Sequence, residues 1–201
     1  MTDVNLPTKP ATVNAAGVPQ PGALLRARKE RAADPAELVA MVELLFFAYR
    51  DFTAEPDAIL AQLGFGRAHH RVLHFVNRNP GLRVADLLEV LKITKQSLGR
   101  VLKELVGQGY VVQTAGENDR RERRLNLTES GRQLAKRLLD IQTRRIEAAL
   151  AAAGNDSERV ARSFLLAVIA DADRAEVKRL VGGGASTRQT DIGQSTEGDD
   201  R

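Results

Sequence analysis

Apolar side chains recur at helical spacing between Thr94 and Gly107, and polar side chains fall between them. The apolar stripe consists of Leu98, Val101, Leu102, Leu105 and Val106. The opposite face carries Gln96, Arg100 and Lys103, with Lys95 and Gly99 on its flank. Thr94 is a suitable N-cap because its hydroxyl can accept a backbone hydrogen bond, and Gly107 and Gly109 end the pattern. We therefore predict a helix that is buried on one side and cationic on the other.

The segments on either side of this helix predict a helix-turn-helix followed by a β-hairpin. A short apolar helix is expected over Val84–Leu91, and only two residues then remain for a tight turn before Thr94. Tyr110–Thr114 is β-branched and aromatic, residues 116–119 are typical of a turn, and Arg123–Leu127 alternates well enough for a return strand. Short helix, turn, longer helix and hairpin is the order of elements in a winged helix-turn-helix.

Further amphipathic segments predict a mainly α-helical chain. Helices are expected from Asp34 to a break at Glu55–Pro56, over Asp57–Leu63, over Arg67–Asn77, from Thr128 to Ala153 and from Asn155 to about Leu180. The predicted fold class is mainly α with a small β-hairpin wing: a winged helix-turn-helix plus terminal dimerisation helices. In the predicted domain, 34–181, dimerisation helices occupy 34–64 and 129–181 and the winged lobe occupies 66–128. Residues 1–33 and 182–201 are polar, and we expect them to be a disordered extension and tail.

The positive charge of the chain is concentrated in the predicted helix and hairpin. Between Lys92 and Arg124 stand eight lysines and arginines and four carboxylates, an excess of +4 that equals the net charge of all 201 residues. Four of these arginines lie at the hairpin tip, where they can reach phosphates or a narrow minor groove. A solvated basic surface without a ligand is the alternative, but a capped helix, an apolar stripe and a basic hairpin in this order favour DNA binding.

The segment from Gly66 to Leu134 resembles the MarR family of bacterial transcriptional regulators. The resemblance rests on the helix-turn-helix sequence that follows His70 and on a wing pattern formed by Asp119, Arg121, Leu127 and Thr128. It implies that Arg121 enters or flanks the minor groove and that Asp119 orients it. It also implies a homodimer in which the N- and C-terminal helices of two chains intertwine.

Ten side chains are expected to contact double-stranded DNA. They are Thr94, Lys95, Gln96, Ser97, Arg100, Lys103, Asp119, Arg120, Arg121 and Arg123. Glutamine and arginine can make bidentate hydrogen bonds to adenine and guanine edges, and a two-fold dimer with helices ~34 Å apart needs a pseudo-palindromic operator. Gly99 departs from the family, where serine or threonine is common at this position. A glycine within a helix costs ~1 kcal/mol relative to alanine, so Gly99 either permits close approach of the backbone to DNA or reflects drift.

The three histidines and most of the aromatic residues precede the predicted helix-turn-helix. His69, His70 and His74 share one predicted helix, and the spacing of His70 and His74 permits a metal or haem contact. The alternative is that these rings pack between helices or subunits. MarR-like proteins often bind small aromatic or anionic effectors between the dimerisation helices and the winged lobe. The matching residues here are Tyr49, Arg50, Arg67, His70 and Arg71, whose cations can hold a carboxylate.

Composition excludes several classes of function. The chain has no cysteine, which excludes disulfides and thiolate chemistry and fits a reducing compartment. It has no apolar run of ~20 residues and no signal-peptide core, so we expect a cytoplasmic protein without membrane contact. No Ser/His/Asp set, phosphate loop or zinc motif is present, so neither enzymatic activity nor a cofactor is expected.

The predicted function is a dimeric, sequence-specific regulator modulated by a small-molecule effector. The alternatives are a metal- or haem-responsive regulator using the histidines and a protein–protein adaptor that retains the fold without DNA binding.

Overall fold

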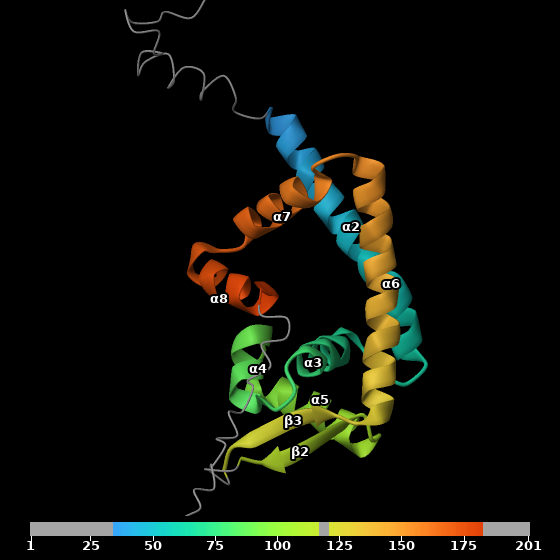
Figure 1. The fold of residues 1–201 in the computed structure, drawn as a ribbon, viewed down its shortest axis with the longest axis vertical. Coiled ribbons are helices and arrows are strands. Elements are labelled where there is room, and N and C mark those ends of the chain that lie inside the picture. The colour runs from blue at the N-terminus through green and yellow to red at the C-terminus, as the bar shows by residue number, and fades with distance from the viewer. Residues whose placement is uncertain (1–33, 117–120, 183–201) are drawn as a thin grey trace, which may run out of the picture. The chain divides into compact units, whose positions relative to one another are not determined.

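A computed structural model describes residues 34–116 and 121–182 of the chain. In this part the helices are α2 (Pro35–Ala61), α3 (Arg67–Arg78), α4 (Val84–Leu91), α5 (Lys95–Gly107), α6 (Glu129–Ala153), α7 (Ser157–Val168) and α8 (Asp171–Gly182), and the strands are β1 (Leu82–Arg83), β2 (Val111–Ala115) and β3 (Arg123–Leu127) (Figure 1). The first half of α2, as far as Asp51, belongs to one compact unit, and the chain from Phe52 onward belongs to a second. The predicted class, mainly α with a small hairpin, is confirmed. The predicted disordered extension and all but the first residue of the predicted tail lie outside the described residues.

Helix α2 continues through Pro56, so the predicted break at Glu55–Pro56 is wrong. Proline removes one intrahelical hydrogen bond and crowds the preceding turn, which usually bends or ends a helix. Here Pro56 is fully buried, and Thr53 and Leu60 on the same face are buried with it. Packing of this face offsets the missing hydrogen bond. The helix ends instead at Ala61, shortly before Gly64 turns the chain with a φ of +72°.

The predicted hairpin is part of a three-stranded antiparallel sheet with the order β1-β3-β2. Val111 pairs with Leu127 at one end of the hairpin and Ala115 with Arg123 at the other, so β2 is displaced by one residue from its predicted range. The sequence pattern does not predict β1, because two residues are too few for a visible alternation. Since β1 leads directly into α4 and pairs with β3, it joins the helix-turn-helix to the wing.

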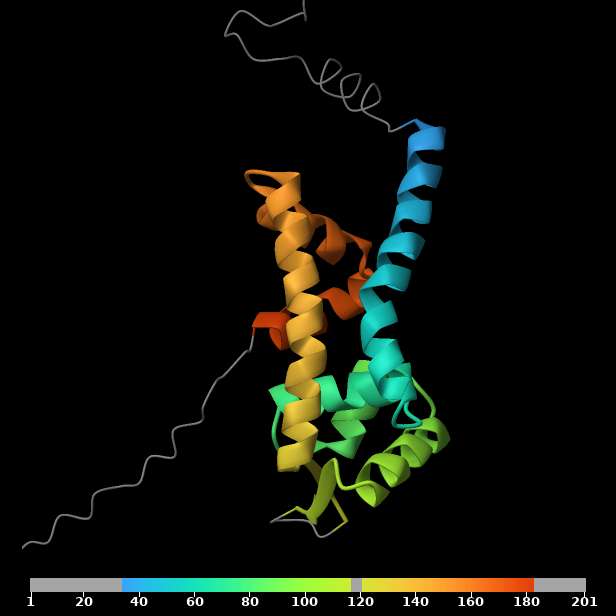
Figure 2. The same cartoon turned by 90° about the vertical axis from the view of Figure 1, so that its right-hand side faces the viewer.

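A single cluster of apolar side chains holds α5 in place. Its fully buried members include Leu73 of α3, Leu87 of α4, Leu98 and Leu105 of α5, Leu125 of β3 and Leu138 of α6. Helix α3 contacts α4, α5, α6 and β3, so it lies at the centre of the lobe. These elements gather around the first half of α6, whose second half extends beyond them (Figure 2). The outer face of α5 is therefore presented by a closely packed lobe.

Hydrogen bonds and close packing join the N-terminus of α6 to the residues that follow α5. Thr128 N-caps α6, as predicted: its Oγ1 accepts a hydrogen bond from the Gly131 N–H at 3.0 Å. The same hydroxyl donates to the Gly109 carbonyl oxygen at 2.6 Å. Gly131 lies directly against the backbone of Tyr110 and has no room for a side chain. This junction sets where the long helix leaves the winged lobe.

The last predicted helix is two helices, α7 and α8, so the single helix expected to about Leu180 is wrong. Helix α7 ends because Ile169 adopts an extended conformation, which leaves the last carbonyl groups without intrahelical partners. The guanidinium group of Arg174 supplies those partners, donating to the carbonyl oxygens of Leu166 and Ile169 at 2.9 Å each. Apolar periodicity continues across this corner and therefore does not reveal it.

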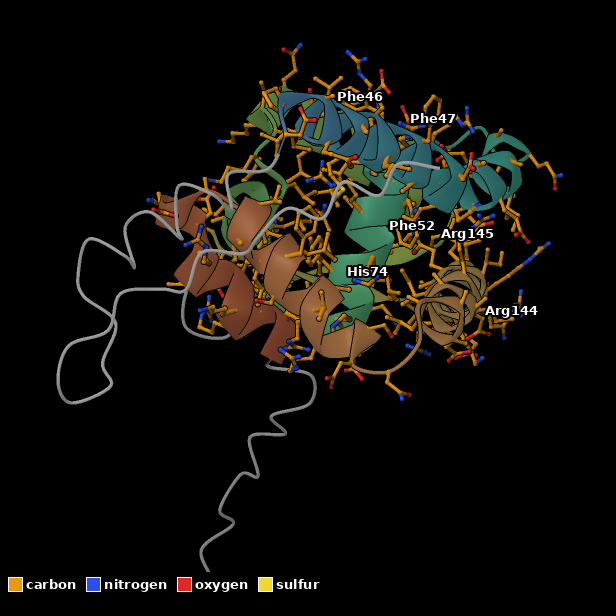
Figure 3. The ribbon with its side chains drawn as sticks, turned by 90° about the horizontal axis from the view of Figure 1, so that it is seen from above. Phe46, Phe47, Phe52, His74, Arg144 and Arg145 are labelled. Carbon is orange, nitrogen blue, oxygen red and sulfur yellow. The ribbon has the colours of Figure 1, made fainter. Side chains whose placement is uncertain are left out.

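The first half of α2 exposes a long run of apolar side chains. At least half of the surface of each is accessible at Leu38, Val39, Val42, Leu44, Phe46, Phe47 and Tyr49. Phe46 and Phe47 project from the helix in Figure 3. In the second unit, α7 likewise exposes Val160, Leu165 and Val168. Exposed apolar surface of this extent is typical of a region that another chain covers. Within the described residues, no helix combines the length and apolar character needed to cross a bilayer.

Candidate nucleic-acid interface

Helix α5 begins in a defined geometry. In the turn after α4, Lys92 adopts the left-handed conformation, and its N–H donates to the Leu88 carbonyl oxygen at 2.9 Å. Thr94 then N-caps α5, as predicted, by accepting the Ser97 N–H at 3.1 Å, and its hydroxyl donates to Ser97 Oγ at 2.9 Å. The first turn of α5 is therefore ordered before it meets any ligand.

The two faces of α5 differ as the sequence predicts, with one exception. Leu98, Val101, Leu102 and Leu105 are buried, whereas Lys95, Gln96, Ser97, Arg100 and Lys103 are exposed. The exception is Val106: the spacing predicts that it completes the buried stripe, but it is 40% exposed. Each residue turns an α-helix by about 100°, and this turn carries Val106 out of the buried arc that ends at Leu105. The five polar and cationic side chains form a continuous face that can approach base edges and phosphates.

A groove of about 850 Å³ runs between α5 and the wing. Helix α5 contributes Lys95, Gly99, Lys103 and Val106 to it, α4 contributes Val84, Ala85 and Leu88, and the wing contributes Gln113, Arg121 and Arg123. Cationic side chains thus come from both walls, while the α4 contribution is apolar. A groove of this composition fits a polyanion that also presents apolar surface, such as the sugar–phosphate strand of DNA.

Among the described residues, Glu122 is the one carboxylate that lines the groove, and it is held by arginines. Glu122 lies 2.8 Å from Arg124 Nε and 3.8 Å from the nearest Arg83 nitrogen. Arg83 also binds Asp86, and this hydrogen bond lowers the pKa of the Asp86 carboxyl group. The sequence pattern does not single out Arg83 or Glu122, although an arginine three residues before an aspartate at a helix start is a detectable sign of such a pair. These ion pairs join β1 to the start of β3 and offset the negative charge of Glu122.

The wing residues predicted to contact DNA are only partly described. Arg121 and Arg123 are exposed and line the groove, together with Lys95 and Lys103. Asp119 and Arg120 lie outside the described residues, so the proposed orientation of Arg121 by Asp119 stays a prediction. The structure therefore brings the helix and two of the wing arginines to one surface.

His69 connects α3 to α5. The ring is buried, stacks on Phe65 with centroids 4.6 Å apart, and accepts the Gly66 N–H at Nδ1 at 3.1 Å. Because Nδ1 is an acceptor, we assign the ring proton to Nε2, which lies 2.7 Å from a carboxylate oxygen of Glu104 on α5. Both ring nitrogens are thus engaged. Among residues 34–116 and 121–182, no three histidine or acidic side chains are grouped in a way that could hold a metal ion, and the histidine-based metal or haem alternative gains no structural support.

The burial of His70 and His74 is expected to make the free energy of unfolding depend on pH. Burial lowers the pKa of both rings; for His70 the opposing influences are Asp57 and a hydrogen bond with Gln142 of α6. Below the usual pKa of 6.5, the unfolded chain therefore binds more protons than the folded chain, and the free energy of unfolding falls as pH decreases. We expect a lower melting temperature at pH 5.5 than at pH 7.5, with a smaller decrease in the double variant His70→Gln/His74→Gln. An equal decrease in both proteins would show that carboxylates alone produce the effect.

The residues predicted to form an effector pocket have partners of their own. Arg67 Nε lies 2.8 Å from Asp57 Oδ2, and Arg71 donates to the Leu91 carbonyl oxygen at 2.9 Å. His70 instead faces α6 through Gln142. In the first unit, Arg50 pairs with Asp51 and lies over the Phe47 ring, and Tyr49 is exposed. The groove beside α5 contains none of these five residues, and the effector pocket stays a prediction.

A short helix, a tight turn, a second helix with an exposed cationic face and an antiparallel hairpin together define a winged helix-turn-helix protein. A model of the MarR family matches residues 63–122. The HTH-type transcriptional regulator PetP of Rhodobacter capsulatus is 48% identical over 139 residues, which cover 69% of this chain and 84% of PetP. The chain therefore belongs to the MarR family and is a transcriptional regulator rather than an enzyme.

Solved structures agree with this fold. NadR in complex with 4-hydroxyphenylacetate has a TM-score of 0.54 and 26% identity, and the match covers 63% of this chain and 91% of NadR. A MarR family regulator from Listeria monocytogenes complexed with a 26mer DNA has a TM-score of 0.58 at 17% identity, covering 72% of this chain and 95% of that one. The second similarity concerns the fold alone.

Proposed function

We propose that the protein is a dimeric, sequence-specific DNA-binding regulator that places α5 in the major groove and the wing at the minor groove. The observation that carries this proposal is the position of one cationic groove between α5 and the wing. It is lined by Lys95 and Lys103 from the helix and by Arg121 and Arg123 from the wing. A helix in one DNA groove and a hairpin in the next must bracket a phosphate strand, and charges on both sides would hold it.

The proposed dimer accounts for the apolar surface of α2. A run such as Leu38, Val42 and Phe46 exposes more apolar area than a lone chain usually leaves in water. Covering it with a second copy related by a two-fold axis would present two copies of α5 about one DNA turn apart, ~34 Å. The operator would then be a pseudo-palindrome. The cytoplasm remains the expected location.

Selection of genomic fragments with the purified full-length chain tests the proposed function. We expect enrichment of fragments that share a pseudo-palindromic site, and a binding constant that falls steeply as salt rises because neutralised phosphates release counterions. The same protein should elute as a dimer. A chain that prefers no duplex even at low salt would contradict the proposal and support the protein–protein adaptor instead.

Replacing Phe46 with glutamate should dissociate the proposed dimer. Phe46 is 70% exposed in the single chain, so the substitution has little to disrupt within the chain but would place an unpaired charge in the interface. We expect light scattering to show a monomer, and operator affinity to fall by at least tenfold because the two half-sites are then bound separately. Glu43→Gln on the same helix is the control and should remain a dimer. A dimeric Phe46→Glu protein would place the interface elsewhere.

We further propose that a small aromatic carboxylate lowers the affinity for DNA. NadR, at 26% identity, is solved in complex with 4-hydroxyphenylacetate, and α3 of this chain carries Arg67, His70 and Arg71, of which the two guanidinium groups can hold a carboxylate. Titrating the protein–operator complex with 4-hydroxyphenylacetate and related aryl acids tests this. Unchanged affinity with every acid would exclude this effector class without affecting the DNA-binding proposal.

A further inference from the structure

Gly99 lies in the middle of α5, where a glycine weakens the helix, and nothing in the described part of the fold requires it. Its φ is not positive, unlike that of Gly64, Gly81 or Gly109. Outside its own stretch of helix, a Cβ atom built at position 99 would meet no described atom within 4 Å. An alanine would therefore fit the isolated chain and would lower the entropic cost of forming the helix. The described residues therefore give no reason for a glycine at this position.

The position of Gly99 in the groove supplies such a reason. Gly99 lines the groove one helical turn from both Lys95 and Lys103, and Arg121 and Arg123 of the wing line it as well. The space left by the missing side chain is therefore part of the groove, and cations flank it along α5. Glu122, the carboxylate in the groove lining, is already paired with Arg124.

We propose that Gly99 is the point at which the sugar–phosphate strand of the operator comes closest to α5. The inference rests on the proposed function, because the strand that separates the major groove from the minor groove must pass between a helix in one and a wing in the other. Phosphates then lie between the helix lysines and the wing arginines, and a deoxyribose lies over the bare backbone at position 99. Any side chain here moves the strand away from α5 and lengthens the lysine–phosphate contacts, whose strength depends on short distances.

The variant Gly99→Ala tests the inference because stability and DNA affinity should change in opposite directions. We expect the melting temperature to rise by roughly 2–4 °C, from improved helix propensity without a steric clash. The dissociation constant for the selected operator should rise at least tenfold, and further in Gly99→Leu. Because the contact is with the backbone of DNA, the same loss should appear on non-specific duplex. The control Gly66→Ala adds a methyl group elsewhere on the lobe surface, also with no atom within 4 Å, and should leave affinity unchanged.

Each other outcome has a definite meaning. A Gly99→Ala protein that is more stable and binds DNA as wild type does would overturn the inference and leave the proposed function standing. A loss limited to the specific operator would assign Gly99 to a base edge and overturn the sugar–phosphate assignment. A less stable variant would contradict the premise that the fold accepts a side chain at this position. If the wild-type chain itself prefers no duplex, it is the proposed function that fails.

Discussion

Replacing Arg100 and Arg121 together with alanine is expected to lower operator affinity by about a hundredfold or more. Arg100 is exposed on the outer face of α5, where a bidentate contact with guanine contributes about 1–3 kcal/mol of discrimination. A dimer uses each residue twice, so Arg100 alone would account for about 2–6 kcal/mol. Arg121 lines the groove from the wing, where contact with the backbone or minor groove adds affinity on any sequence.

The single variants separate these two roles. Arg100→Ala should reduce the preference for the operator over other sequences, whereas Arg121→Ala should weaken binding about uniformly and lower the salt dependence. Fluorescence anisotropy at several salt concentrations measures both effects. The control is Arg144→Ala/Arg145→Ala, which removes two exposed arginines from α6 (Figure 3). If the control loses as much affinity as the test variant, net charge rather than the α5–wing surface determines binding.

Substituting alanine for Gly131 should lower the free energy of unfolding by about 3 kcal/mol or more. Overpacking a well-filled site usually costs about 1–3 kcal/mol, and here the new methyl group would overlap the Tyr110 carbonyl oxygen and lie 3.2 Å from Leu127 Cβ. A backbone carbonyl cannot rotate away as a side chain can. The shift would also disturb the Thr128 hydroxyl, which binds both Gly109 and Gly131.

Urea unfolding at matched protein concentration measures the effect of the Gly131 substitution, because the stability of a dimer depends on concentration. Gly99→Ala is the matched comparison: both residues are helical glycines, but Gly99 has open space around it. We expect the two variants to change stability in opposite directions. A Gly131→Ala protein as stable as wild type would mean that α6 can move away from Tyr110 without loss.

Local chemistry determines which parts of the fold can be predicted from sequence. Thr94 and Thr128 are predictable as caps because each bonds to a backbone N–H only three residues away. The continuation of α2 through Pro56 and the corner at Arg174 depend on contacts that local preference does not record. The polar face of α5 is also predictable, because it follows from the spacing of residues along the sequence. The groove is not predictable, since α4, α5 and the wing form it together only after folding.

The hydrogen bonds of the two His69 ring nitrogens affect how α3 and α5 can move. One nitrogen binds the backbone at Gly66, where α3 begins, and the other lies against Glu104 of α5. Together with the shared apolar core, these bonds hold α3 and α5 in a fixed orientation relative to each other. A ligand that tilts α3 would therefore reorient α5 as a rigid piece and leave its internal shape intact. Such a ligand would change the position of α5 relative to the DNA, whereas the side chains that α5 presents to the bases would stay the same.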